Sequence, residues 1–198
     1  MTGIQEQIQS FLLEGSDTLR SLAGESETIS RIVQRIVEAY RNEKKLVVFG
    51  NGGSAADAQH FVTELTVRFE KNRRPLPALA LATNTSEMTA IGNDLGFGEL
   101  FSRQVEAHVL PGDVVVGIST SGRSVNVLRG LKAARERGAC VIALAGKTGG
   151  EMSSLTDICL RVPSASTAHV QEGHIAAIHA ICLLVEQALC PDLGAGNE

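Results

Sequence analysis

The sequence predicts a doubly wound α/β domain: a five-stranded parallel sheet with helices on both faces. Two observations carry this prediction. Five short, predominantly apolar runs recur along the chain, and segments with helical periodicity separate them. A continuous apolar run is typical of a strand buried on both faces, as parallel sheets require. Alternation of strand and helix favours the same architecture, because parallel strands need a crossover connection.

The N-terminal part precedes this alternation. Apolar residues from Ile4 to Leu22 fall near helical spacing, and those from Ile29 to Tyr40 do so more clearly. We therefore expect residues 1–44 to form helices that pack on the domain or on a neighbouring subunit. The α/β domain is expected over 45–190, followed by a disordered tail over 191–198.

The five expected strands follow in order. They are Leu46–Phe49, Ala78–Ala82, Val114–Ile118, Cys140–Leu144 and Ile158–Val162. The helix between the third and fourth strands shows its periodicity at Val125, Leu128 and Leu131 and closes at Gly138. The pattern as a whole predicts a flavodoxin-like sheet, in which ligands bind beyond the carboxyl ends of the strands.

Composition narrows the functional classes. With 198 residues, of which 43% are hydrophobic, the chain suffices for one sizeable core. A net charge of −4, from 18 Lys and Arg against 22 Asp and Glu, argues against direct nucleic-acid binding. The four cysteines lie in apolar stretches without a C-x-x-C pair, which predicts free thiols in a reducing compartment. No leader pattern and no uncharged apolar stretch of about 18 residues is recognisable, so we expect a cytoplasmic protein without membrane contact.

Two loops after strands contain candidate ligand-binding groups. The first, Gly50-Asn51-Gly52-Gly53-Ser54, lets a ligand approach the backbone closely, although a plain strand-to-helix turn explains it equally well. The second, Ser119-Thr120-Ser121-Gly122-Arg123-Ser124, gathers four hydroxyls at the expected start of a helix. Hydroxyls, backbone amides and the helix dipole all favour a phosphate there, whereas ordinary N-capping needs only one Ser or Thr.

Two helices contain candidate catalytic groups. On the helix after Ser54, His60 and Glu64 are spaced i, i+4 and face the same way; a solvated surface pair is the alternative. The last helix, about 167–189, is apolar almost all round, which predicts a central or interface position. Gln171 and His179 are polar exceptions within it, and a hydrogen-bonded core histidine is the alternative for His179.

Taken in order, these motifs resemble the SIS (sugar isomerase) domain, and more narrowly the phosphoheptose isomerases, over nearly the whole chain. The matching strings are Gly50–Ser54, Asp57-Ala58-Gln59-His60, Glu64, Gly92-Asn93-Asp94, Gly117–Gly122, Ser124 with Asn126, and Gln171-Glu172 with His179. Two positions depart from many relatives: Val67 stands in place of Gly, and His169 in place of Arg.

The resemblance implies interconversion of sedoheptulose 7-phosphate and D-glycero-D-manno-heptose 7-phosphate, for surface polysaccharide, by a zinc-containing homotetramer with active sites at subunit interfaces. It implies phosphate binding by Ser119, Thr120, Ser121 and Ser124, sugar binding by Asn51, Gly52, Gly53, Asn93, Asp94 and Gln171, and zinc binding by His60, Glu64, Gln171 and His179.

Aldose–ketose exchange moves a proton between C1 and C2 through an enediol, which needs one group on the carbon acid and another on the oxygens. We assign Glu64 as the carbon base and His179 as its partner in proton transfer. A non-enzymatic SIS protein of the replication-initiator-associating type is the main alternative. Such relatives lack the equivalents of Glu64 and His179, which this chain has. An SIS protein that recognises another sugar phosphate, such as an amino-sugar phosphate, is a further alternative.

Overall fold

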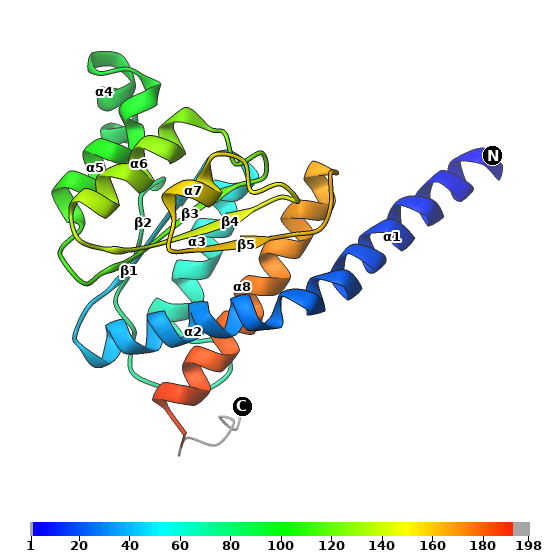
Figure 1. Cartoon of the computed structure of the whole chain (residues 1–198), viewed down its shortest axis with the longest axis horizontal. Helices are drawn as coiled ribbons and strands as arrows, with labels where there is room; N and C mark the ends of the chain where they lie inside the picture. Colours follow the sequence, from blue (N-terminus) through cyan, green and yellow to red (C-terminus); the bar gives the residue numbers. More distant parts are fainter. Residues whose placement is uncertain (1, 192–198) are drawn as a thin grey trace.

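The computed structural model of the chain describes residues 2–191 and contains one parallel sheet of five strands in the order β2-β1-β3-β4-β5 (Figure 1). The strands are β1 (Leu46–Gly50), β2 (Ala78–Ala80), β3 (Val114–Ser119), β4 (Cys140–Ala145) and β5 (Ile158–Arg161). This order confirms the predicted doubly wound sheet. Only β2, an edge strand, is clearly shorter than its apolar run. The expected tail lies, from residue 192 on, outside the described residues.

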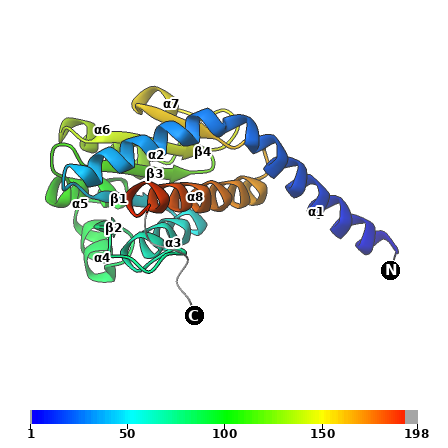
Figure 2. The same ribbon diagram turned by 90° about the horizontal axis from the view of Figure 1, so that it is seen from below.

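Helices cover both faces of the sheet (Figures 1 and 2). They are α1 (Thr2–Leu22), α2 (Ser26–Arg41), α3 (Gly53–Thr66), α4 (Thr85–Asp94), α5 (Leu100–His108), α6 (Val125–Glu136), α7 (Met152–Leu155) and α8 (Thr167–Leu189), with short 3-10 turns at Ala23–Glu25 and Phe97–Glu99. The apolar side chains of α2, α3 and α8 share one core layer, and those of α4, α5 and α6 share the other.

The strands feed both layers because successive side chains of a strand point to opposite faces. In β1, Leu46 and Val48 join the α2, α3 and α8 layer, whereas Val47 and Phe49 join the opposite layer. All five residues of β1 are buried, and so are all six of β3. This explains why these strands appear in the sequence as unbroken apolar runs.

Strand β1 is the topological switch point of the sheet. It pairs with β2 on one side and with β3 on the other, so the connections that follow β1 and β3 leave the sheet in opposite directions. The crevice between their carboxyl ends is the expected ligand site of such a fold. Both candidate loops, after Gly50 and after Ser119, begin there.

Helix α8 is the most apolar long helix of the described chain. Its length and its mean hydropathy of 1.2 would be sufficient for a helix that crosses a membrane, but half of its most apolar stretch is buried inside the fold. It packs against α1, α2 and α3. Burial among these elements accounts for its apolar character, as expected for a central helix.

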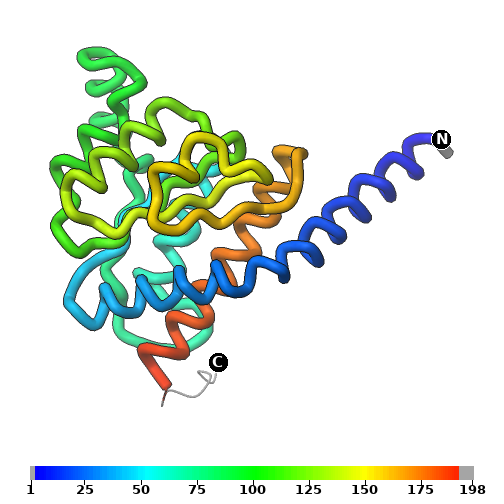
Figure 3. Tube along the Cα trace, viewed as in Figure 1, coloured from blue at the N-terminus to red at the C-terminus, as the bar shows by residue number. Residues whose placement is uncertain are grey.

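Helix α1 extends away from the body of the molecule (Figures 1 and 3). From Phe11 onward it lies against α8, and its first turns project beyond the fold (Figure 1). Large apolar side chains along it are exposed in the single chain: Ile4, Ile8, Phe11, Leu12, Leu13 and Leu19. Of these, Phe11 packs on the ring of His169 of α8, with 4.4 Å between ring centroids. An exposed apolar stripe of this length is typical of a protein–protein contact.

His174, on α8, is buried without a charged partner. Its Nε2 lies 3.2 Å from the backbone oxygen of Ala145, while its Nδ1 has no hydrogen-bond partner. Burial lowers the pKa of His174 to about 4, from an ordinary value of 6.5. The unfolded chain therefore binds a proton at this residue between these pH values that the folded chain does not. Stability is present above pH 6.5 and is lost as the pH falls toward 4.

We expect this imidazole alone to reduce the unfolding free energy by about 3 kcal/mol between pH 7 and pH 4. Urea unfolding at fixed protein concentration, compared between wild type and His174→Gln, measures it. The variant should lose stability overall but show the smaller pH dependence. His108→Gln, at an exposed histidine, should keep the wild-type dependence; equal slopes in all three proteins would contradict the assignment.

Candidate active site

The serine-rich loop forms a compact hydroxyl cluster at the end of β3. Ser119 Oγ lies 3.1 Å from Ser124 Oγ and 3.4 Å from Ser121 Oγ, and Ser121 Oγ accepts a hydrogen bond from the backbone N–H of Arg123 at 3.2 Å. Gly122 turns the chain with φ at +64°, a conformation that favours glycine. The loop thereby directs several hydroxyls to one place.

Helix α6 begins directly after this cluster. Ser124 is its N-cap residue, yet its hydroxyl makes no capping hydrogen bond and faces Ser119 instead. The first amides of α6 are therefore not satisfied by the cap side chain, and the positive end of the helix dipole points at the loop. This is the arrangement that binds a phosphate.

A cavity of about 310 Å³ adjoins the loop. Thr120, Ser121 and Arg123 line it, together with Lys147 and Thr148 after β4. Two cationic side chains beside the hydroxyls suit an anionic ligand. The sequence interpretation did not include Lys147. The signal in the sequence that could have identified Lys147 is its place directly after the buried strand β4.

The glycine loop after β1 lies next to the start of α6. Asn51 and Asn126 exchange side-chain amide hydrogen bonds of 2.9 and 2.8 Å, which joins this loop to α6 across the switch point. Gly52 has a φ of +56°, and α3 begins at Gly53. The side-chain amide of Gln171, on the first turns of α8, lies so close to Gly53 that a Cβ there would collide with it. Only glycine leaves room for this contact.

Three of the predicted catalytic and metal-binding residues converge between α3 and α8. The Nε2 atoms of His60 and His179 lie 3.0 Å apart, and Glu64 Oε1 lies 3.1 Å from His60 Nε2. The side chain of His60 is 43% exposed and that of Glu64 22% exposed. His179 is therefore not a buried core histidine: it lies at the surface of the single chain and pairs with His60.

Asp57, one turn before His60 on α3, is a further carboxylate beside this cluster. Its Oδ2 is buried without a hydrogen-bond partner. Burial raises the pKa of Asp57, and the nearby His60 lowers it in part. The sequence interpretation placed Asp57 on this helix without a role. The spacing of Asp57, His60 and Glu64 at i, i+3 and i+7 indicates that all three share one face.

The single chain holds the remaining predicted residues apart from this cluster. Gln171 precedes His179 by two turns of α8, about 12 Å along the helix axis, and lies at Gly53 instead. Asn93 and Asp94, at the end of α4, are exposed and hydrogen-bonded to each other at 2.7 Å. The sugar-binding and zinc-binding assignments of these residues remain predictions.

The donor atoms of the cluster are of the kinds that bind zinc, but they lie slightly closer to one another than ligand atoms around a zinc ion do. Two imidazole nitrogens and a carboxylate oxygen are ordinary zinc ligands. Ligand atoms around a tetrahedral zinc lie about 3.3 Å apart, whereas the distances here are 3.0 and 3.1 Å. As placed, no group of three or more His, Cys, Asp or Glu side chains among residues 2–191 is arranged so that it could hold a metal ion. Small side-chain movements and a fourth ligand are needed to complete a zinc site.

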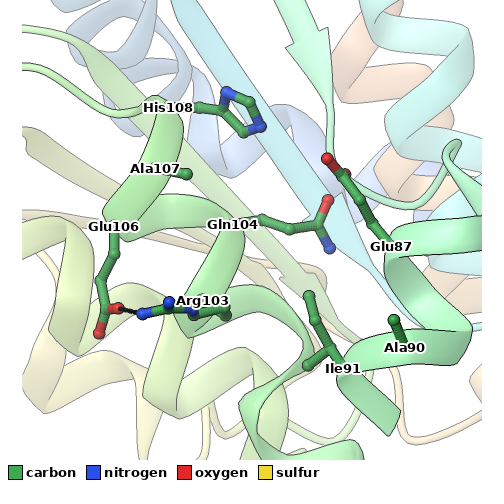
Figure 4. Close-up of a pocket in the computed structure, with 8 residues that line it drawn as sticks. All are labelled: Glu87, Ala90, Ile91, Arg103, Gln104, Glu106, Ala107 and His108. Carbon is green, nitrogen blue, oxygen red and sulfur yellow. Dashed lines mark hydrogen bonds and ion pairs between the residues drawn. The ribbon is translucent and has the colours of Figure 1, made fainter. Parts of the chain in front are cut away.

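A second cavity, of about 400 Å³, lies between α4 and α5 (Figure 4). Its lining includes Ile91, Gln104, His108 and the ion pair of Arg103 with Glu106. None of the predicted site residues lines it. It is therefore separate from the crevice between β1 and β3.

Several known proteins are similar to this chain in sequence and in fold. The SIS domain family matches residues 10–146. A phosphoheptose isomerase of Geobacter sp. (strain M21) is 55% identical over 93% of this chain and 96% of its own length. Among solved structures, a phosphoheptose isomerase from Neisseria gonorrhoeae is 42% identical, with a TM-score of 0.89 over 93% of this chain and 99% of that one. A phosphoheptose isomerase from Francisella tularensis is 36% identical, with a TM-score of 0.90 over 94% of this chain and 100% of that one. The chain belongs to the phosphoheptose isomerases of the SIS domain family.

Proposed function

We propose that this protein is an aldose–ketose isomerase that interconverts sedoheptulose 7-phosphate and D-glycero-D-manno-heptose 7-phosphate, in heptose biosynthesis for surface polysaccharide. One observation carries the proposal beyond family membership. The glycine loop, which Asn51 joins to Asn126 next to the serine-rich loop, and the cluster of His60, Glu64 and His179 lie at different heights along α3, with about 10 Å between Gly53 and His60. The substrate carries its phosphate on C7 and reacts at C1 and C2, so its two ends suit these two places.

The phosphate end anchors the substrate. Ser119, Thr120, Ser121 and Ser124 donate hydroxyl hydrogen bonds to phosphate oxygens, and the first amides of α6 add the field of the helix dipole. Lys147 contributes a positive charge from the neighbouring loop. Anchoring by the non-reacting end orients C1 and C2, and orientation of this kind lowers the barrier of the chemical step.

The opposite end moves the protons. Glu64 takes the proton from C1 of the ketose, the electrons of that bond form the enediol, and a proton delivered to C2 completes the aldose. His179 transfers the proton between the two oxygens, O1 and O2. A zinc ion held by His60, Glu64 and His179 with a fourth ligand would polarise the carbonyl as a Lewis acid.

We also propose that the protein is a cytoplasmic homotetramer. The exposed apolar stripe of α1 and the partly open cluster of His60, Glu64 and His179 both support burial against another copy. The four free thiols suit a reducing compartment. Light scattering should give a molar mass of four chains of 20.9 kDa. Replacing Ile8 and Leu12 by Glu should shift the mass toward smaller species, and a wild-type monomer would contradict this assembly.

The decisive test of the function is conversion of sedoheptulose 7-phosphate to an aldose phosphate by purified protein supplied with zinc. We expect turnover with this substrate and little with the neutral heptulose, because the latter cannot use the phosphate loop. Fructose 6-phosphate and amino-sugar phosphates serve as comparisons. Preference for one of these would favour the alternative SIS isomerase, and no conversion of any sugar phosphate would favour the non-enzymatic interaction protein.

A further inference from the structure

A buried ion pair joins the two helices that carry the reacting end of the site. Arg73 Nε lies 3.0 Å from Glu186 Oε1, and the two side chains are 0% and 1% exposed. Arg73 belongs to the segment between α3 and β2, and Glu186 to the last turns of α8. Neither residue has a place in the phosphate loop or in the histidine cluster.

Arg73 holds the end of α3. Its guanidinium donates to the backbone oxygens of Glu64 and Leu65 at 2.8 and 2.9 Å, and to that of Arg74 at 3.1 Å. The last carbonyls of a helix lack partners within it, so these bonds take the place of a C-terminal cap. One of the two helix carbonyls belongs to the residue assigned as the carbon base.

Glu186 holds the segment that follows α3. Its carboxylate accepts hydrogen bonds from the backbone N–H groups of Glu70 and Lys71, at 2.8 and 3.1 Å, in addition to the one from Arg73. The adjacent Phe69 packs near the ring of His179, with 5.9 Å between ring centroids. The carboxylate therefore fixes the backbone next to an aromatic ring that contacts the catalytic histidine.

The ion pair is also connected to His179 through α8, because Glu186 and His179 belong to the same helix. Glu186 follows His179 by seven residues, two turns, and so lies on nearly the same face of the helix about 10 Å away. α3 and α8 lie side by side (Figures 1 and 2). The register between these helices decides whether Glu64 reaches C1 while His179 reaches O1 and O2 of the same substrate.

Stability alone gives little reason for this arrangement. Desolvating two charges offsets most of their attraction, and apolar replacements of similar volume are often neutral or stabilising. The ion pair does fix the position of one helix relative to the other, because its directional hydrogen bonds allow only one placement of the end of α3 against α8.

We propose that Arg73 and Glu186 are positioning residues for the isomerisation, which fix α3 against α8 so that Glu64 and His179 act on one substrate. This role rests on the proposed function. It concerns geometry rather than affinity, because the phosphate loop lies on other elements. Loss of the ion pair should therefore reduce kcat and leave KM nearly unchanged.

The test is the double variant Arg73→Met/Glu186→Leu, which removes both charges and leaves no buried charge unpaired. We expect cooperative unfolding and a molar mass like those of wild type, a kcat lower by about 100-fold and a KM within about threefold. Arg73→Lys keeps the charge and loses the forked hydrogen bonds. Its kcat should lie between that of wild type and that of the double variant. If the double variant does not fold, Arg73→Lys decides the question by the same comparison.

A second readout follows the histidines directly. Carbethoxylation of His60 and His179, located by peptide mass spectrometry, should be faster in the double variant because the two imidazoles no longer shield each other. The matched control, Arg103→Gln/Glu106→Gln, removes the exposed ion pair seen in Figure 4 and should match wild type in both readouts.

Wild-type kcat and wild-type histidine reactivity in a folded double variant would overturn the proposal. A fall in kcat that merely follows the folded fraction would overturn it as well. If wild type converts no sugar phosphate, the proposed function fails, and histidine reactivity alone then decides whether the ion pair positions the cluster.

Discussion

Glu64→Gln is expected to lower kcat by at least about 10³-fold, because an amide cannot accept the proton from the substrate carbon. The change keeps the size of the side chain, so the fold and the phosphate loop should be preserved. His179→Gln should have a comparable effect through loss of proton transfer between the oxygens. The measurement is the initial rate with sedoheptulose 7-phosphate over a range that gives kcat and KM separately.

Two controls separate this expectation from a general loss of structure. Glu136→Gln and His108→Gln change exposed residues away from the crevice and should keep wild-type rates. Both active-site variants should keep the wild-type molar mass and still bind inorganic phosphate. Near-normal turnover in Glu64→Gln and His179→Gln would show that the catalytic roles are wrongly assigned, even if the activity is as proposed.

Removal of metal should stop turnover nearly completely. The cluster of His60, Glu64 and His179 presents two imidazoles and a carboxylate, a donor set suited to zinc and poorly suited to Mg²⁺. Dialysis against a chelator should therefore abolish conversion, and zinc but not Mg²⁺ should restore it. Metal content by atomic emission, measured on the same samples, relates activity to zinc per chain.

His60→Ala provides the matched variant for this experiment. It removes one imidazole and leaves the assigned base, Glu64, in the sequence. We therefore expect the variant to bind less zinc and to keep phosphate binding at the serine loop. Lys132→Ala, at an exposed lysine of α6, should bind zinc as wild type does. Full activity in protein shown to contain no metal would exclude zinc from the mechanism.

Much of the fold could be predicted because it depends on local patterns. The unbroken apolar runs of β1 and β3 indicated strands buried on both faces, and the order of strand and helix indicated a parallel sheet. The short α7 was not anticipated, because four residues are too few to show a period.

The candidate site could be predicted only in part. The spacing of His60 and Glu64 showed that they share a helix face, but the proximity of His179 is a contact across 119 positions in the sequence. His179 looked like a buried polar residue because its helix is so apolar. In the structure it lies exposed, opposite His60.

The sequence by itself determined the class of fold, the two candidate ligand-binding loops and the residue types proposed for catalysis. These depend on periodicity, on glycine at positive φ and on hydroxyls at a helix start, all of which are local properties. Only the tertiary structure decided that α3 packs beside α8, that Gln171 lies at Gly53, and that Arg73 with Glu186 ties the two helices together. The physical reason is that periodicity shows only on which side of its own helix a side chain lies. Which helices become neighbours depends on the crossover connections and on packing against the sheet.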